Sequence, residues 1–238
     1  MGQIVSLQAT MFVMIALGVL VRKTGMVGEE GRQNITDLVL NVILPANIVK
    51  SFLIPFDMQT LRSFAVVLGI SVCIQIGALV LGRLLYAHTE ETRRKCLVNG
   101  LLCSNAGFLG NPIAEGVYGS LGLAYASIYL IPQRIMMWSS GLAVFSGSTD
   151  RREVARKVLR HPCIIACELG LLLLFTQWQL PQVILGPLSS LSACNTALSM
   201  LVIGMILAQL HPADLLDRQA LAYSFVRLVL VPFLVWIP

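Results

Sequence analysis

A break inside a membrane-spanning stretch constrains this chain more than any other feature. Residues 103–116 lie within a run apolar enough to cross a bilayer, yet they contain Gly110, Asn111 and Pro112 in succession. Proline lacks an amide hydrogen and clashes with the carbonyl four residues earlier, and glycine adds backbone freedom, so a helix loses regularity there. Backbone groups freed in hydrocarbon are costly unless protein or a water-filled cavity satisfies them. The segment therefore predicts a solute site built from half-helix ends, a design found in many secondary transporters.

The composition predicts a membrane protein with several spans. Of the 238 residues, 56% are hydrophobic and only 12% are charged, whereas soluble domains carry about 25% charged residues. A spanning helix needs roughly 20 mainly apolar residues. Eight stretches meet this requirement: 3–22, 36–54, 61–86, 96–119, 121–145, 161–178, 183–210 and 219–237. We therefore predict an all-α, polytopic bundle of transmembrane helices in the lipid bilayer.

Basic residues gather in alternate connections between these spans. They follow the first, third and fifth spans: Arg22, Lys23, Arg32, Arg83, Arg93, Arg94, Lys95, Arg151, Arg152, Arg156, Lys157 and Arg160. The intervening connections hold only Lys50 and Arg62. By the positive-inside rule, this asymmetry predicts a cell-membrane protein whose N-terminus lies outside. It also explains the net charge of +5 without a nucleic-acid partner. Because the first basic residues follow the first apolar core, that segment is not expected to be a signal peptide.

The order of the spans predicts two units of opposite orientation. The polar stretch 146–160 separates a five-helix unit, 1–145, from a second unit, 146–238. Because five is an odd number, the second unit begins on the opposite side of the membrane, as in an inverted repeat. It supplies three spans, so we expect this repeat to be incomplete and to lack counterparts of the fourth and fifth spans.

Small and polar residues around the break are the candidate binding groups. A half-helix that begins near Pro112 presents free amide groups and a positive dipole end to an anion. Asn105 and Asn111 offer side-chain donors and acceptors, and Gly107 and Gly110 allow close approach to the backbone. The alternative is a kink used only for helix packing, since glycine and proline are frequent in membrane helices.

Ionisable residues within the spans are the next candidates, because they often mark solute pathways. Arg134 and Arg227 could attract an anion, or they could form structural ion pairs with Glu115 or Glu168. The cysteines and histidines give no metal-ligand cluster or catalytic triad, and the sequence holds no phosphate-binding loop. We therefore expect no metal, no cofactor and no enzymatic activity.

Three motifs make the chain resemble the auxin efflux carrier family. They are Leu44-Pro45 in the second span, the segment from Asn105 to Pro112, and Arg227-Leu228 followed by Pro232. The resemblance implies ten helices in two inverted five-helix repeats, with broken helices four and nine crossing at a site for small organic anions. It further implies that Asn111 and Pro112 belong to the crossover, and that Pro45 and Asn47 face it. Against this pattern, we expect the chain to lack the last two helices.

These observations predict a secondary transporter or facilitator that moves small organic anions, such as mono- or dicarboxylates, by alternating access. Two alternatives stay open. One is a carrier like the bile-acid/sodium symporters, and the other is a truncated membrane protein that does not transport. The sequence does not determine the substrate, the ion coupling, the direction of transport or the oligomeric state, for which a homodimer is one option.

Overall fold

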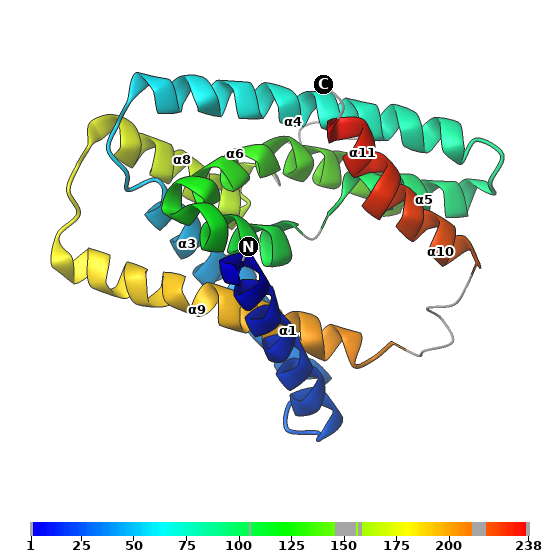
Figure 1. The fold of residues 1–238 in the computed structure, drawn as a ribbon, viewed down its shortest axis with the longest axis horizontal. Helices are drawn as coiled ribbons and strands as arrows, with labels where there is room; N and C mark the ends of the chain where they lie inside the picture. The colour runs from blue at the N-terminus through cyan, green and yellow to red at the C-terminus, as the bar shows by residue number, and fades with distance from the viewer. Residues whose placement is uncertain (1, 105, 146–155, 157–158, 211–217, 237–238) are drawn as a thin grey trace. The chain divides into compact units, whose positions relative to one another are not determined.

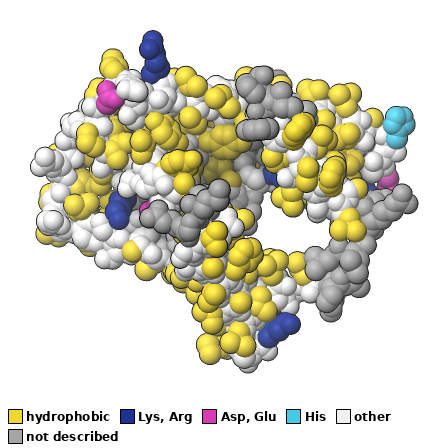
Figure 2. Space-filling view, in the orientation of Figure 1, with side chains coloured by type: hydrophobic (Ala, Val, Ile, Leu, Met, Phe, Trp, Pro, Cys, Tyr) yellow, Lys and Arg dark blue, Asp and Glu magenta, His cyan; other side chains and the backbone are white. Residues whose placement is uncertain are grey.

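The computed structural model describes residues 2–104, 106–145, 156, 159–210 and 218–236. Every regular element in this part of the chain is a helix (Figure 1). Hydrophobic side chains cover much of the face in Figure 2, and few charged ones interrupt them. Three helices are long and apolar enough to cross a membrane: Val5–Lys23, Met58–Leu85 and Gln182–Leu207. The all-helical class is confirmed, while the arrangement of eight spans in inverted repeats stays a prediction.

Described helices occupy parts of all eight predicted stretches. The α-helices are α1 (Gly2–Lys23), α2 (Glu29–Leu38), α3 (Leu44–Ser51), α4 (Met58–Leu85), α5 (Glu91–Leu102), α6 (Asn111–Phe145), α8 (Pro162–Thr176), α9 (Gln182–Leu207), α10 (Arg218–Phe225) and α11 (Val231–Trp236). Three short π-helices adjoin them: η1 (Val39–Ile43), η2 (Ala106–Gly110) and η4 (Val226–Leu230).

Each of these π-helices ends two residues before a proline. The prolines are Pro45 after η1, Pro112 after η2 and Pro232 after η4. A proline ring clashes with the carbonyl four residues earlier and cannot donate a hydrogen bond to it. A π turn is wider, because its hydrogen bonds span five residues, and it moves that carbonyl aside. The three motifs that carry the family resemblance thus share one local structure, a π turn followed by a helix with proline in its first turn.

The helix α6 consists of two helices joined at Gly119. This glycine has φ 64° and ψ −156°, a conformation that side chains other than hydrogen strongly disfavour. It separates residues 111–118 from residues 120–145, at the boundary predicted between the fourth and fifth spans. The helix that follows the break is therefore a short half-helix.

The chain forms two compact units. The first comprises 1–67, 105–130 and 159–209, and the second comprises 68–104, 131–158 and 210–238. Each unit draws helices from both halves of the sequence. The boundary at residues 145 and 146 refers to sequence repeats rather than to compact units, and it stays a prediction.

Two glycines let α1 and α9 pack with their backbones in contact in the first unit. A Cβ atom on Gly18 would collide with the carbonyl of Leu201, and one on Gly204 would collide with the carbonyl of Ile15. Membrane helices lack a hydrophobic driving force for association. Small residues let their backbones approach closely, so that van der Waals packing holds them together. The helix α3 packs against both α8 and α9, and its buried side chains include Leu44 and Asn47.

Candidate functional site

The break in the fourth predicted span covers the described residues 103–104 and 106–110. The helix α5 ends at Leu102, and Cys103 is extended, with φ −99° and ψ 112°. The π-helix η2 begins at Ala106, and regular α-helix resumes at Asn111. The interruption therefore begins earlier than the proline motif alone suggests, and Asn111 marks the start of the second half-helix. Asn105, one of the predicted binding residues, lies outside the described residues.

Asn111 is fully buried, and neither atom of its side-chain amide has a hydrogen-bond partner. Nearly all buried polar groups in proteins are paired, and an unpaired one costs about 1–3 kcal/mol. Asn195 of α9 is also fully buried, and its amide nitrogen has no partner. Unpaired buried amides of this kind can bond to a solute or to an ordered water.

Asn47 connects three helices through its side-chain amide. Its Nδ2 donates to Oε2 of Glu115 on α6 over 3.2 Å, and its Oδ1 accepts from Oγ of Ser192 on α9 over 2.5 Å. Glu115 lies four residues after Asn111, so the carboxylate and the unpaired amide share one face of the half-helix. The predicted pair Asn47 and Asn111 is thereby joined to one polar cluster of the first unit.

Ser192 and Asn195 were not among the predicted binding residues. The signal that could have found them is a helical repeat of polar residues along α9, namely Ser189, Ser192, Asn195 and Ser199. Ser192, Asn195 and Ser199 are buried. In an otherwise apolar span, such a stripe identifies a face that meets other polar groups and not lipid.

The other residues predicted around the break pack closely on their neighbours. Pro112 is buried, and Pro45 is half-buried just after η1. A Cβ atom on Gly107 would lie 3.6 Å from Cδ2 of Leu44, which is an ordinary contact. One on Gly110 would lie 3.2 Å from the preceding turn of its own helix. The segment that leads into Asn111 therefore lies next to Leu44 of α3, and η2 packs against α9.

The two predicted arginines belong to the second unit and differ in their partners. Arg134 is 7% exposed, and its Nη1 has no hydrogen-bond partner. Arg227 instead donates from Nη1 to the backbone carbonyl of Gly100 over 2.5 Å and to that of Leu101. The partners of Arg227 are therefore carbonyls at the end of α5 rather than a carboxylate.

Gln133 holds the chain just beyond α5. Its Nε2 donates to the backbone carbonyl of Ser104 over 2.7 Å, and its Oε1 accepts from the hydroxyl of the same residue over 2.7 Å. Gln133 is itself 6% exposed. One buried amide thus satisfies both the backbone and the side chain of a residue that lies within the break.

A cavity of about 760 Å³ opens in the first unit, and we call it the vestibule. Its lining includes Ile54 and Pro55, Ser120, and the stretch Gln177–Leu180. These residues lie in or next to the three connections predicted to face the outside of the cell. The vestibule therefore collects, at one place, connections that charge patterning assigns to one side of the membrane.

Polar residues lead from the vestibule to the buried cluster. Lys50 lines the vestibule and lies one turn after Asn47 on α3. Ser189 lines it as well and lies one turn before Ser192 on α9. Residues three positions apart share a helix face, so the two helices offer a continuous polar surface between the cavity and the cluster.

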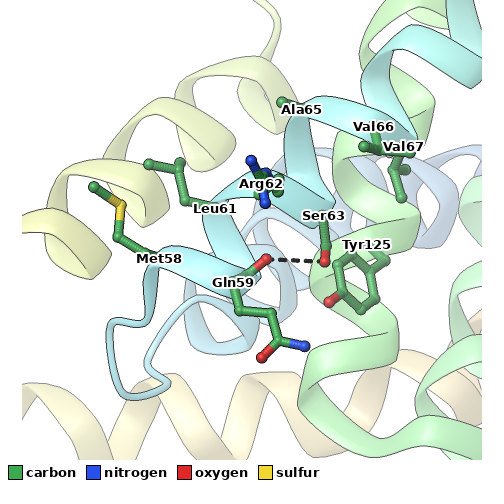
Figure 3. A pocket seen from close by; sticks show the side chains of 9 residues that line it. All are labelled: Met58, Gln59, Leu61, Arg62, Ser63, Ala65, Val66, Val67 and Tyr125. Atoms are coloured by element: carbon green, nitrogen blue, oxygen red, sulfur yellow. Dashed lines mark hydrogen bonds between the residues drawn. The ribbon is translucent and has the colours of Figure 1, made fainter.

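A larger cavity of about 1090 Å³ is shown in Figure 3. It lies between the beginning of α4 and Tyr125 of α6, with Arg62 as its charged lining residue. The hydroxyl of Ser63 donates to the carbonyl of Gln59 over 2.9 Å, so its hydrogen bond lies within its own helix. None of the predicted binding residues lines the cavity, and most of its lining is apolar. We therefore place the candidate site at the buried cluster instead.

Known proteins identify the class of this chain. A family model described as "Membrane transport protein" matches residues 4–237. The chain belongs to this family. It is the auxin efflux carrier family that the three proline motifs indicated. A relative from Methanothermobacter thermautotrophicus, named as an uncharacterized transporter, is 31% identical over 209 residues, which cover 83% of the chain and 66% of the relative.

A second transport-family relative comes from Methanocaldococcus jannaschii and is also named as an uncharacterized transporter. It is 23% identical over 205 residues, covering 82% of the chain and 66% of the relative. The chain thus spans just under two thirds of the length of these two relatives.

Proposed function

We propose that this membrane transport protein is a secondary carrier or facilitator for small organic anions, with the substrate bound where the second half-helix begins. Asn111 carries the proposal, because its side-chain amide is fully buried and neither of its atoms has a hydrogen-bond partner. The half-helix that begins with η2 also has the positive end of its dipole on this side, which favours negative charge. A carboxylate accepting from these groups would satisfy donors that are otherwise unpaired.

The charges around this cluster require a positive partner for the anion. Glu115 lies one turn from Asn111, and two like charges close together repel each other strongly at low dielectric. The bond from Asn47 holds this carboxylate but does not neutralise it. We propose that Lys50, which lines the vestibule of the same unit, supplies this positive charge and draws the anion in.

The composition of the two units supports an inverted repeat. The first unit contains α1, α2 and α3 from the first half of the chain and α8 and α9 from the second half. The second unit contains the later part of α4 and α5 from the first half and α10 and α11 from the second half. An inverted repeat brings equivalent helices of its two halves together in this way. We propose that substrate access alternates through movement of one bundle against the other, as in other carriers with broken helices.

The contacts of the first unit support the predicted grouping of the connections into two sides, and with the positions of the basic residues we propose that the N-terminus lies outside the cell membrane. The vestibule gathers the connections predicted to lie outside. The amide of Gln209 after α9 donates to the carboxylate of Glu29 at the start of α2. Glu29 belongs to a connection predicted to be cytoplasmic, and Gln209 lies at the end of the seventh predicted span that is predicted to face the same side. Segments of the same predicted side therefore meet one another.

Flux through reconstituted protein tests the proposal. Proteoliposomes are loaded with labelled malonate, malate or indole-3-acetate, and initial efflux is measured for Asn111→Ala and Pro112→Ala. Loss of one hydrogen bond to a charged group corresponds to about a tenfold loss of flux at low substrate concentration. Asn34→Ala is the matched control, because Asn34 is an exposed asparagine of α2. Unchanged flux in both site variants would contradict the proposal that the substrate binds at this half-helix.

The same assay separates the two alternative functions. Efflux that stops when choline replaces sodium would favour a carrier like the bile-acid/sodium symporters. Saturable binding of a probe without any turnover would favour a membrane protein that does not transport.

A further inference from the structure

The C-terminal end of α5 leaves backbone carbonyls inside a predicted span. The last bond of helical spacing at this end runs from the amide of Cys103 to the carbonyl of Asn99 over 2.9 Å. The carbonyls of Gly100 and Leu101 would next bond to the amides of residues 104 and 105, but the chain leaves the helix at Cys103. Such carbonyls need another partner in hydrocarbon, and the helix dipole adds partial negative charge at the same end.

Arg227 meets this need with a full positive charge. Its Nη1 donates to both carbonyls, over 2.5 Å to Gly100 and also to Leu101. The guanidinium therefore satisfies the orphan acceptors and opposes the negative end of the dipole at once. The carbonyl of Ser104, further along the break, is occupied by Nε2 of Gln133 over 2.7 Å.

Packing fixes the approach of Arg227 to α5. Tyr223 lies one turn before Arg227, and a Cβ atom on Gly100 would lie 2.5 Å from the Tyr223 hydroxyl oxygen. Any side chain at position 100 would force the ring of Tyr223 to move. Arg227 itself lies within η4, the π turn that precedes Pro232. Three separate sequence features, Gly100, Tyr223 and the π turn, thus bring one cation to the end of one helix.

The same kind of helix end binds an ion in other carriers. In transporters with broken helices, unwound backbone carbonyls and the C-terminal ends of half-helices coordinate the coupling sodium ion. We propose that Arg227 is a tethered cation that takes the place of a coupling ion at the C-terminal end of α5, so that transport does not require sodium. Arg227 is on this view a positioning residue, since it holds the first half of the broken helix that continues along the chain to Asn111.

The reactivity of Cys103 tests this proposal without any transport substrate. Cys103 lies in the break, directly after α5, and its thiol donates to Oδ1 of Asn99 over 3.6 Å. In a variant that keeps Cys103 as its single cysteine, we measure the rate of alkylation by N-ethylmaleimide in detergent. Arg227→Ala should raise this rate about tenfold, because α5 loses the partner of its last carbonyls and its end frays. Arg227→Lys should restore much of the protection.

Chemical rescue distinguishes a cation site from general loss of packing. Millimolar ethylguanidinium chloride should slow the alkylation of the Arg227→Ala protein, whereas tetramethylammonium chloride at equal ionic strength should not, since it cannot donate hydrogen bonds. Arg83→Ala is the matched control, because Arg83 is an exposed arginine of α4 in the same unit. If Arg227→Ala and Arg83→Ala react alike, or if ethylguanidinium has no effect, the proposal is overturned.

A second arm concerns sodium and rests on the proposed transport function. Efflux of the labelled carboxylates by the unaltered protein should be the same in sodium chloride and choline chloride. Efflux by Arg227→Ala should fall and should recover in part with ethylguanidinium. Sodium-dependent efflux by the unaltered protein would overturn the proposal. Should no probe be transported at all, the proposed function fails, and the Cys103 rates still decide the role of Arg227.

Discussion

At the scale of the residue, buried side-chain amides and single charged side chains connect segments that lie far apart in the sequence. Asn47 has both side-chain atoms bonded to other helices, whereas Asn111 has neither atom bonded. The first is therefore a structural connector, and the second is the residue that we propose binds the substrate. Arg227 and Glu29 resemble Asn47 in this respect, because each of these charged side chains bonds to more than one partner.

Glu29 should make stability depend on pH. It forms ion pairs with Arg22 and Arg32 and accepts from Gln209. The hydrogen bond from Arg32 is the largest of several contacts that lower the pKa of Glu29 from 4.5 to about 2. A depressed pKa stabilises the folded state above the unfolded pKa, and this contribution is lost as pH falls from about 4.5 towards 2.

Thermal unfolding in detergent between pH 7 and pH 3 measures this effect. The midpoint of the Glu29→Gln protein should be lower than that of the unaltered protein at pH 7, and the two should converge towards pH 3. The difference should be small, because Glu29 is exposed and solvent screens its charge. Glu30→Gln controls for removal of a neighbouring exposed carboxylate. A constant difference across the pH range would contradict the assignment.

At the scale of the element, proline and glycine act in different ways. Proline next to a π turn reshapes one helix locally, and this happens at all three motifs that carry the family resemblance. Glycine at a helix crossing sets the distance between two helices, as Gly18 and Gly204 do for α1 and α9. The effect of proline can be predicted from the sequence of one span, but the effect of glycine depends on both of the helices that cross.

Alanine substitutions should separate packing glycines from spectator glycines. Gly204→Ala places a methyl group against the carbonyl of Ile15, and overpacking of this kind costs about 1–3 kcal/mol. Gly77→Ala, within α4, has no atom within 4 Å of the added Cβ, so it should be neutral or should stabilise by up to about 1 kcal/mol through helix propensity. Thermal midpoints in detergent compare the two. Shifts of the same sign would contradict the close contact between α1 and α9.

At the scale of the whole molecule, each compact unit combines helices from both halves of the chain. The proposed inverted repeat gives a reason for this mixing, since equivalent helices from the two halves would meet around one axis. Within the first unit, Lys50 lines the vestibule, and Glu29 forms ion pairs at the start of α2.

Labelling of single cysteines tests the proposed orientation. In a cysteine-free background, Gln179→Cys at the vestibule should react with a membrane-impermeant maleimide in intact cells. Gly28→Cys, in the connection before α2, should react only after the membrane is permeabilised. Both positions are exposed in the structure, so protein packing should not block the reagent at either one. The reverse pattern would place the N-terminus in the cytoplasm.

The sequence by itself determined the helical class and the transport family, and it indicated that the fourth predicted span is interrupted, although the interruption begins earlier than the proline motif suggests. These follow from composition and from proline and glycine, which act within their own turn and need no distant partner. It did not reveal the partners of the polar side chains. Ser192 bonds to Asn47 across 145 positions, and Arg227 bonds to Gly100 across 127 positions. A polar group within a span must find a partner, but only the packing of the helices decides which partner it meets. For that reason the tertiary structure alone distinguished Asn111, which is left unpaired, from Arg227, which is held at the end of α5.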